Sequence, residues 1–368
     1  TSQLWARSFA PDYYQSYKDE NSLHIPNRLG FSTVSWGEPK RGFVEDSEDA
    51  KKKGNFDPED CQNAYNMLLD AGIAFVDTSE NFGKGMRPNS LSAEEILGTC
   101  VKDTSSDFDP MIASSFQARF RLGNRDTVCN TAEETLARMG TPSMTLYQVR
   151  PSLASTIGIG ALAQGMVDAI DEGFCEYVGM IDANRGKLQA MRRALDKRDE
   201  TLTSNQFEFS LVNRKKEALI AHCKRAEVIP LIRNPFGSDG LGSGIWTSED
   251  PTGGGKGRRF SDKVLEKWEP LHSMLFRIVE KVQKRAPTTS GGGRELKDFK
   301  AKKYEKKKES VVITPPMIAI NYIVAKGGVP LVDVYDTETA KQLLGCLGWS
   351  LTDEEIIQLE QAAELSAM

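Results

Sequence analysis

The chain alternates short apolar segments with segments of helical spacing from residue 63 to residue 334. Strands are predicted at residues 73–76, 111–114, 145–149, 177–180, 202–205, 228–232 and 329–334, and helices at residues 63–71, 93–101, 159–172 and 317–324. Gly72 and Gly173 stand where two of these helices should end. This alternation predicts an α/β fold, a TIM (β/α)8 barrel rather than an open doubly wound sheet. A G-x-G-x-x-G segment after the first strand, which an open dinucleotide-binding sheet would need, is absent from the sequence.

Composition agrees with one large soluble barrel. The chain has 368 residues, of which 39% are hydrophobic and 27% charged, and its net charge of -5 gives no reason to expect nucleic acid. Its six cysteines include no CxxC pair and its three histidines are far apart, so we expect reduced thiols and no metal site. Because no apolar run approaches the roughly 20 residues that span a bilayer, we expect no transmembrane segment.

Two segments fall outside the alternation. Residues 1–27 form a polar and aromatic N-terminal extension, which leaves residues 28–368 for the barrel. The chain begins at Thr1, which we interpret as a mature protein whose targeting segment has been removed or is not part of this sequence.

Residues 284–310 form an insertion before the last barrel helices. A glycine-rich stretch leads there into residues 294–309, which hold eight Lys or Arg against four Asp or Glu. The insertion is either a solvated loop or a docking element for an acidic partner or an anionic membrane surface.

Several motifs together resemble the aldo-keto reductase family, in particular its plastid and cyanobacterial-type members. They are Leu29-Gly30-Phe31 with Ser35-Trp36-Gly37, Ala74 to Gly83, Glu94-Glu95-Ile96-Leu97-Gly98, Leu146-Tyr147-Gln148, Ser204-Asn205-Gln206 with Arg214, and Gly348 to Glu355. The resemblance covers roughly residues 28–365 and implies the barrel fold.

The resemblance also implies four catalytic positions. In the family a tyrosine gives a proton to the carbonyl oxygen, a lysine and an aspartate lower the pKa of that tyrosine, and a histidine orients the carbonyl. These groups are needed because hydride transfer builds negative charge on the oxygen, which a proton and hydrogen-bond donors must stabilise. Here only the aspartate is kept. The four positions hold Asp77, Phe82 for the tyrosine, Ser115 for the lysine and Arg150 for the histidine. We therefore expect no catalytic residue.

Asp77 has lost its lysine partner, and we expect it to form a structural ion pair with Arg150 across the barrel mouth. The alternative is that Arg150 binds an anionic ligand with both arms of its guanidinium group, with the Ser115 hydroxyl nearby.

The nicotinamide end of the family's cofactor site is changed as well. Ile181 and Asp182 replace a Ser-Asn pair, and Arg233 replaces a tyrosine that stacks on the nicotinamide. Gln206 is retained, either as a cofactor contact or as a buried amide that the backbone satisfies.

The phosphate end has lost its cation. The family segment I-P-G-x-[KR]-x aligns with residues 331–337, which puts Tyr335 or Asp336 in the place of the cation that binds the 2′-phosphate. A carboxylate there would repel phosphate. We therefore expect no cofactor, or NADPH if residual binding is kept.

These changes predict a non-catalytic protein with a structural or interaction role. We expect a subunit of, or an accessory to, a larger plastid complex of the thylakoid photosystem type, in the stroma or on the stromal face, which docks other protein subunits through residues 1–27 and 284–310. One alternative is an NADP(H)-dependent oxidoreductase with an altered proton donor, such as Ser115, Tyr147 or Asp182. Another is a nucleotide-sensing regulatory subunit.

Overall fold

The structure is a computed structural model that describes residues 22–38, 57–83, 91–117, 125–151, 158–253, 259–285 and 312–367. Most of the predicted N-terminal extension and of the predicted insertion lies outside these ranges. The docking of other protein subunits or of a membrane surface through these two segments therefore stays a prediction, as do the domain bounds.

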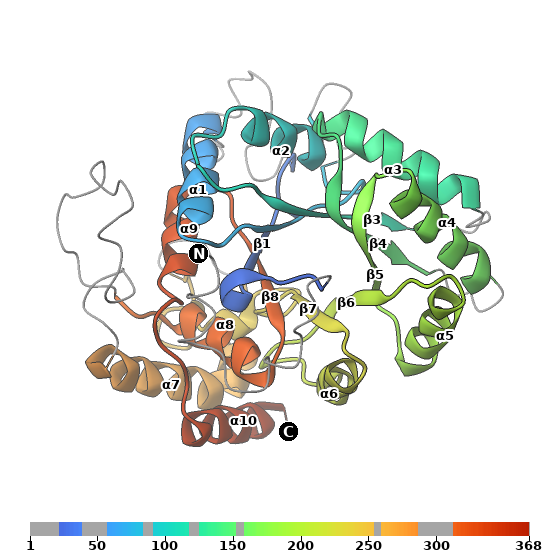
Figure 1. The fold of residues 1–368 in the computed structure, drawn as a ribbon. Helices are drawn as coiled ribbons and strands as arrows, with labels where there is room; N and C mark the ends of the chain where they lie inside the picture. Colours follow the sequence, from blue (N-terminus) through green and yellow to red (C-terminus); the bar gives the residue numbers. More distant parts are fainter. Residues whose placement is uncertain are drawn as a thin grey trace.

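Parallel strands close into a barrel in the order β1 to β8, which confirms the predicted fold (Figure 1). The strands are β1 (Gly30–Ser32), β2 (Phe75–Asp77), β3 (Met111–Gln117), β4 (Met144–Arg150), β5 (Cys175–Ile181), β6 (Leu202–Glu208), β7 (Ile229–Arg233) and β8 (Val329–Asp333). The barrel closes because β1 pairs with both β2 and β8. All carboxyl ends of the strands therefore meet at one mouth.

Helices surround the strands (Figure 1). They are α1 (Pro58–Asp70), α2 (Ala93–Lys102), α3 (Arg125–Met139), α4 (Ile159–Asp171), α5 (Arg185–Asp196), α6 (Glu217–Arg225), α7 (Asp262–Arg285), α8 (Pro315–Lys326), α9 (Thr337–Leu344) and α10 (Asp353–Ala367), with short 3-10 turns at Pro26–Arg28 and Leu241–Ser243. The first turn of α2 is fixed by a capping box between Ser92 and Glu95. Gly72 and Gly173 follow α1 and α4 with φ of 77° and 76°, as their predicted role at helix ends requires.

The barrel interior is layered from apolar to polar. Near the starts of the strands, a buried cluster joins Phe75, Leu146, Leu231 and Leu331 to Leu23 and Ile25 from below the barrel. Toward the ends of the strands, the buried side chains become polar: Ser32, Asp77, Ser115, Gln148, Ser204 and Gln206. The apolar layer stabilises the barrel, and the polar layer forms the floor of its mouth.

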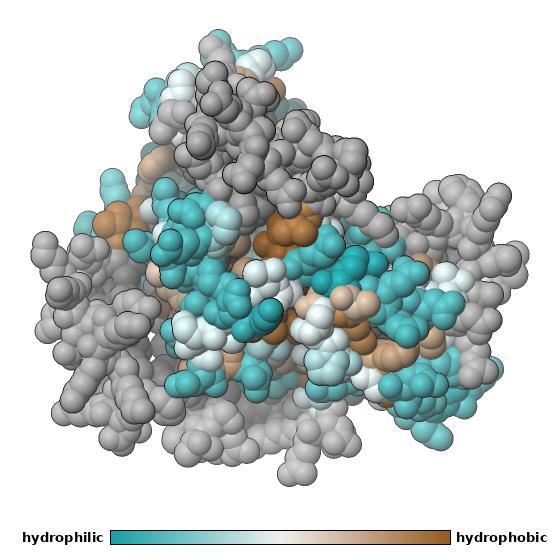
Figure 2. Space-filling model, turned by 90° about the horizontal axis from the view of Figure 1, so that it is seen from above, coloured by the Kyte–Doolittle hydropathy of each residue, from teal (hydrophilic) through white to brown (hydrophobic). Residues whose placement is uncertain are grey.

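In the described part of the chain, no helix combines the length and the apolar character that crossing a membrane requires. Figure 2 shows hydrophilic residues mixed with small hydrophobic areas over the described residues of one face. Scattered apolar side chains of this kind are ordinary on a protein surface.

Candidate active site

The barrel mouth brings together side chains from strands that are far apart in sequence. Asp77 ends β2, Arg150 ends β4 and Arg233 ends β7, while Gln206 lies on β6 and Asp182 follows β5 directly. The site positions predicted from sequence on these strands therefore do meet at one end of the barrel.

Asp77 is buried at the floor of this mouth, with 3% of its surface exposed. The Gln206 side-chain amide donates a hydrogen bond of 2.7 Å to Asp77 Oδ1, and the Ser32 hydroxyl donates one of 2.9 Å to Oδ2. Gln206 is thus a buried amide, as one of our two interpretations required, but its partner is a carboxylate and not the backbone. Both oxygens of Asp77 are held in fixed positions.

Burial controls the protonation of this carboxyl group. Removal from water raises the pKa of Asp77 from its ordinary value of 3.8 to about 6, although the hydrogen bonds from Ser32 and Gln206 and the charges of Arg233 and Arg150 oppose the rise. A carboxyl group with such a pKa exchanges its proton near neutral pH.

Arg150 pairs with Asp182 and not with Asp77, so the predicted Asp77–Arg150 ion pair is wrong. Arg150 Nη2 lies 3.3 Å from Asp182 Oδ2, and the structure contains no such contact to Asp77 among the described residues. The reason is strand order: β4 pairs directly with β5, which Asp182 follows, whereas β3 separates β4 from β2.

Asp182 is the common partner of three cations. Besides Arg150, its carboxylate is 2.8 Å from Arg233 Nη2 and 3.0 Å from Lys216 Nζ. Its backbone has a φ of 52°, and its N–H donates to the Gln206 carbonyl. Burial alone would raise the pKa of Asp182, but the charges and hydrogen bonds of Arg233 and Lys216 together lower it. Asp182 therefore stays ionised and is unsuited to proton donation.

Phe82 and Tyr147 offer no hydroxyl at the mouth. Phe82 packs against the core, and its backbone N–H donates to the Ser79 carbonyl. Tyr147 is fully buried on the outer side of β4, where its hydroxyl donates a hydrogen bond of 3.4 Å to the Val128 carbonyl of α3. Burial raises the pKa of the Tyr147 hydroxyl well above its ordinary value. Our suggestion that Tyr147 could replace the proton donor is therefore wrong.

Ser115 and Ile181 are also buried near the ends of their strands, with 8% and 3% of their surfaces exposed. The Ser115 carbonyl accepts a hydrogen bond of 3.4 Å from the Ser79 hydroxyl. At the nicotinamide end, Ile181 offers no polar group, and Arg233 has a buried Nε without a hydrogen-bond partner among the described residues. A guanidinium group can stack on a neutral ring but repels a cationic one, so this end suits the reduced form of a nicotinamide better than the oxidised form.

A 2′-phosphate does not fit the start of α9. Asp336 caps this helix, since its Oδ1 accepts a hydrogen bond of 2.7 Å from the Thr339 N–H. Asp60 Oδ2 accepts a further one of 3.3 Å from the Thr337 N–H. The helix N–H groups that would attract an anion are thus bonded to two carboxylates. Tyr335, the other candidate position, provides no cation because a tyrosine side chain carries no positive charge. Its backbone N–H is also engaged, since it donates to the Thr339 side chain.

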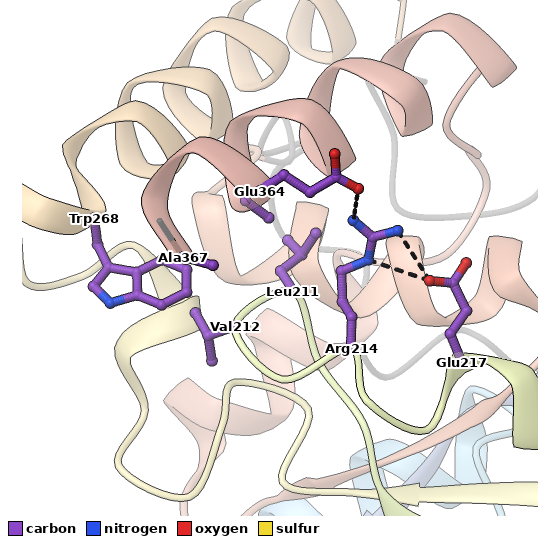
Figure 3. A pocket seen from close by; sticks show the side chains of 8 residues that line it. Leu211, Val212, Arg214, Glu217, Trp268, Glu364 and Ala367 are labelled. Carbon is purple, nitrogen blue, oxygen red and sulfur yellow. Dashed lines mark hydrogen bonds and ion pairs between the residues drawn. The ribbon is translucent and has the colours of Figure 1, made fainter.

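A separate cavity of about 310 Å³ lies between the loop after β6, α7 and α10 (Figure 3). Arg214 projects along it and is bonded to Glu217 and Glu364. This is the arginine of the Ser-Asn-Gln motif, and here it joins the β6 loop to the C-terminal helix. Its charge is already balanced, which indicates a structural role.

A comparison with protein families matches the description "Aldo/keto reductase family" to residues 47–364. The chain belongs to the aldo-keto reductase family. The chloroplastic pyridoxal reductase of Arabidopsis thaliana is 27% identical over 347 residues, which cover 92% of this chain and 83% of that protein. The aldo-keto reductase YhdN of Bacillus subtilis is 25% identical over 65% of this chain and 69% of its own length.

Solved structures share the fold. A glycerol dehydrogenase from Gluconobacter oxydans superposes with a TM-score of 0.64 at 17% identity, covering 93% of this chain and 94% of its own. An aldo-keto reductase from Klebsiella pneumoniae in complex with NADPH gives a TM-score of 0.62 at 16% identity, covering 92% and 90%.

These relatives overturn our prediction of a non-catalytic complex subunit. The family matched over most of the chain is that of the aldo/keto reductases, and both relatives compared by sequence are named as reductases. Loss of the tyrosine is a change within a family of oxidoreductases and does not indicate a new structural role. The narrower prediction that none of Asp77, Phe82, Ser115 and Arg150 is catalytic is not tested by these relatives.

Sequence reasoning missed two members of the site, Ser32 and Lys216. Ser32 lies two residues after Gly30 in the opening strand, so strand alternation places it on the inner face with Asp77. Lys216 belongs to the basic run Arg214-Lys215-Lys216 that follows β6. Its position after a strand, and therefore at the mouth, was the signal that could have identified it.

Proposed function

We propose that this protein is an oxidoreductase that reduces a carbonyl group at the barrel mouth, with Asp77 as the proton source in place of the missing tyrosine. The observation that carries the proposal is the buried Asp77 carboxyl group, held at the floor of the mouth by Gln206 and Ser32. Membership of a family of oxidoreductases supports the reaction class.

Asp77 is the best proton donor among the candidates. Phe82 has no hydroxyl group, Tyr147 faces away from the mouth, and Asp182 is held ionised by its cations. The Ser115 hydroxyl is a much weaker acid than a carboxyl group whose pKa is about 6. A protonated Asp77 can give its proton to the oxygen of a bound carbonyl, and the resulting carboxylate is then stabilised by the two hydrogen bonds and by the nearby positive charges of Arg150 and Arg233.

A reduced nicotinamide dinucleotide, when bound, supplies the hydride in this class of reaction. Arg233 and Gln206 are the residues that would lie at its nicotinamide end. The carboxylates of Asp336 and Asp60 at α9 favour a dinucleotide without the 2′-phosphate. We therefore propose NADH as the preferred cofactor, although relatives were solved with NADP(H).

The substrate and the location follow from the relative with 27% identity. Its name gives pyridoxal as its substrate and the chloroplast as its location, so we propose a small aldehyde as the substrate and the plastid as the compartment.

The test is turnover of pyridoxal and of benzaldehyde with NADH and with NADPH, for the natural protein and for Asp77→Asn. The exposed Asp196→Asn on α5 is the matched control. We expect Asp77→Asn to lower kcat by about 100-fold or more, as loss of a general acid does, and Asp196→Asn to change nothing. Equal turnover by Asp77→Asn and the natural protein would overturn the assignment.

A further inference from the structure

We propose that Arg150 and Arg233 bind an anionic group, a carboxylate or a phosphate, that is part of the carbonyl substrate. This inference rests on the proposed function for the identity of the substrate, but the anion site itself follows from the charges at the mouth.

The cations at the mouth outnumber their internal partner. Arg150, Arg233 and Lys216 all converge on the single carboxylate of Asp182, at 3.3, 2.8 and 3.0 Å. One carboxylate balances one of the three charges, so the cluster has two unbalanced positive charges. Two arginines held this close repel each other unless a further anion lies between them or beside them.

Asp77 offsets at most one of the two excess charges, and only when it is ionised. Its two oxygens accept hydrogen bonds from Gln206 and Ser32, and neither arginine forms an ion pair with it among the described residues. In its protonated form, which its pKa of about 6 keeps accessible, Asp77 carries no charge at all.

The positive charge of Arg233 repels that of Arg150. Burial lowers the pKa of its guanidinium group and the charge of Arg233 lowers it further, while Asp182 and Asp77 act in the opposite direction. Burial is the largest cause of this net lowering, and the charge of Arg233 adds to it. An anion bound beside Arg150 would act in the same direction as Asp182 and favour the charged form of the guanidinium group.

Both arginines also have N–H donors that are not used in their contacts with Asp182. A guanidinium group carries five N–H donors, of which Arg233 uses one Nη2 on Asp182. Its Nε is buried and has no hydrogen-bond partner among the described residues. The Arg150 side chain is 36% exposed and contacts Asp182 through Nη2 at 3.3 Å. Planar forks of this kind recognise carboxylate and phosphate groups with two parallel hydrogen bonds.

A purely structural role explains less. An ion pair that only ties β4 to β5 needs one arginine, and surface pairs of that kind add little to stability. Here all three cations remain partly exposed, with 36%, 31% and 40% of their side chains open to solvent. Exposed, convergent and unbalanced positive charge beside a buried acid is the arrangement of a site for an anionic ligand. Asp182 would keep the arginines in place while the site is empty.

The first arm of the test measures binding without turnover. Inorganic phosphate and malonate are titrated into the protein by calorimetry and thermal shift at constant ionic strength, with chloride as the reference. Arg150→Gln and Arg233→Gln are compared with the exposed Arg193→Gln on α5. We expect saturable binding that weakens about tenfold or more in each mouth variant and is unchanged in Arg193→Gln. The tighter probe tells whether the group is a phosphate or a carboxylate.

The conservative variant Arg150→Lys provides a second comparison in case Arg150→Gln does not fold. It keeps the charge but loses the fork, and we expect it to bind malonate less tightly than the natural protein and more tightly than Arg150→Gln. Equal affinity in all variants, or no binding beyond the effect of chloride up to about 50 mM, would overturn the proposal.

The second arm measures selectivity. Succinic semialdehyde and butanal differ by a carboxylate, and we expect kcat/KM to favour the former about tenfold or more. The readout is the ratio of the two kcat/KM values, which we expect to fall toward one in Arg150→Gln whatever happens to the absolute rates. Equal preference in Arg150→Gln and the natural protein would overturn the proposal. If phosphate or malonate binds as expected but no aldehyde is reduced, the proposed function fails and the anion site stands.

Discussion

The Gln206 amide donates a hydrogen bond of 2.7 Å to the buried carboxyl group of Asp77, from β6 to β2 across the barrel. The two residues are 129 positions apart in the chain. Because of this contact, the Gln206 amide is not satisfied by the backbone alone. The contact also gives Asp77, the one position of the family's catalytic set that the motif comparison finds unchanged, a neutral hydrogen-bond donor as its partner.

Replacement of Asp77 by asparagine should make the protein more stable and less active. Because the pKa of Asp77 rises from 3.8 to about 6 on folding, its ionisation costs the folded state about 3 kcal/mol. As pH rises through about 6, the carboxyl group of Asp77 ionises and the natural protein loses about 3 kcal/mol of stability. The side chain introduced by Asp77→Asn can accept a hydrogen bond from Gln206 and donate one to Ser32 without carrying a charge. We expect denaturant unfolding to show equal stability below about pH 4 and an advantage of up to about 3 kcal/mol for Asp77→Asn above about pH 7. Lower stability of Asp77→Asn at pH 8 would contradict this account.

The pH dependence of reduction should follow the same group. If protonated Asp77 is the proton source, kcat falls as pH rises above about 6, by about tenfold per pH unit. The hydrogen bond from Gln206 lowers the pKa of Asp77, so its removal in Gln206→Leu should move the falling limb to higher pH. Steady-state profiles of both proteins provide the measurement. A limb that stays at the same pH in Gln206→Leu would show that another group controls the reaction.

Cofactor preference should depend on the cap of α9. Asparagine caps a helix about as well as aspartate does, so Asp336→Asn keeps the helix start and removes one negative charge. We expect the ratio of NADPH to NADH affinity to rise about threefold to tenfold, as measured by quenching of tryptophan fluorescence. Asp196→Asn is the control. An unchanged ratio would mean that the adenosine end of the cofactor lies elsewhere.

The packing of α2 on α3 can be tested at one glycine. A Cβ on Gly98 would lie 2.2 Å from the Met139 carbonyl oxygen, so Gly98→Ala must push two helices apart and should cost about 1–3 kcal/mol. At Gly160 in α4 a Cβ would meet nothing within 4 Å, and Gly160→Ala should be neutral or stabilise by up to about 1 kcal/mol. Thermal unfolding of both variants measures their stabilities relative to the natural protein. Equal losses would indicate that the two helices are not in close contact.

The fold could be predicted from sequence because buried parallel strands are short, apolar and regularly spaced. Strand β6 was found as residues 202–205 and extends to Glu208, because polar residues at the mouth interrupt its apolar pattern. Helix α5 was missed although its buried residues Leu188, Met191 and Leu195 stand at i, i+3 and i+7, the spacing of one helix face. The sequence therefore carried the signal for this helix, on an otherwise polar segment.

The site could be predicted only by position. Motif spacing identified Asp77, Arg150 and Arg233, but the partner of Arg150 depends on which strands are neighbours in the closed barrel. Asp182 is that partner, and Asp77 is not, because Asp182 follows the adjacent strand β5. The protonation of Asp77 depends on burial, which has no local sequence signal.

The most direct test of the central claim is transfer of deuterium from NADH deuterated at C4 of the nicotinamide to an aldehyde. The account predicts an alcohol that carries deuterium on its carbinol carbon, formed by the natural protein and about 100-fold more slowly or not at all by Asp77→Asn. Absence of any deuterated alcohol from pyridoxal, benzaldehyde and succinic semialdehyde, with NADH or NADPH deuterated in the same way, would contradict it.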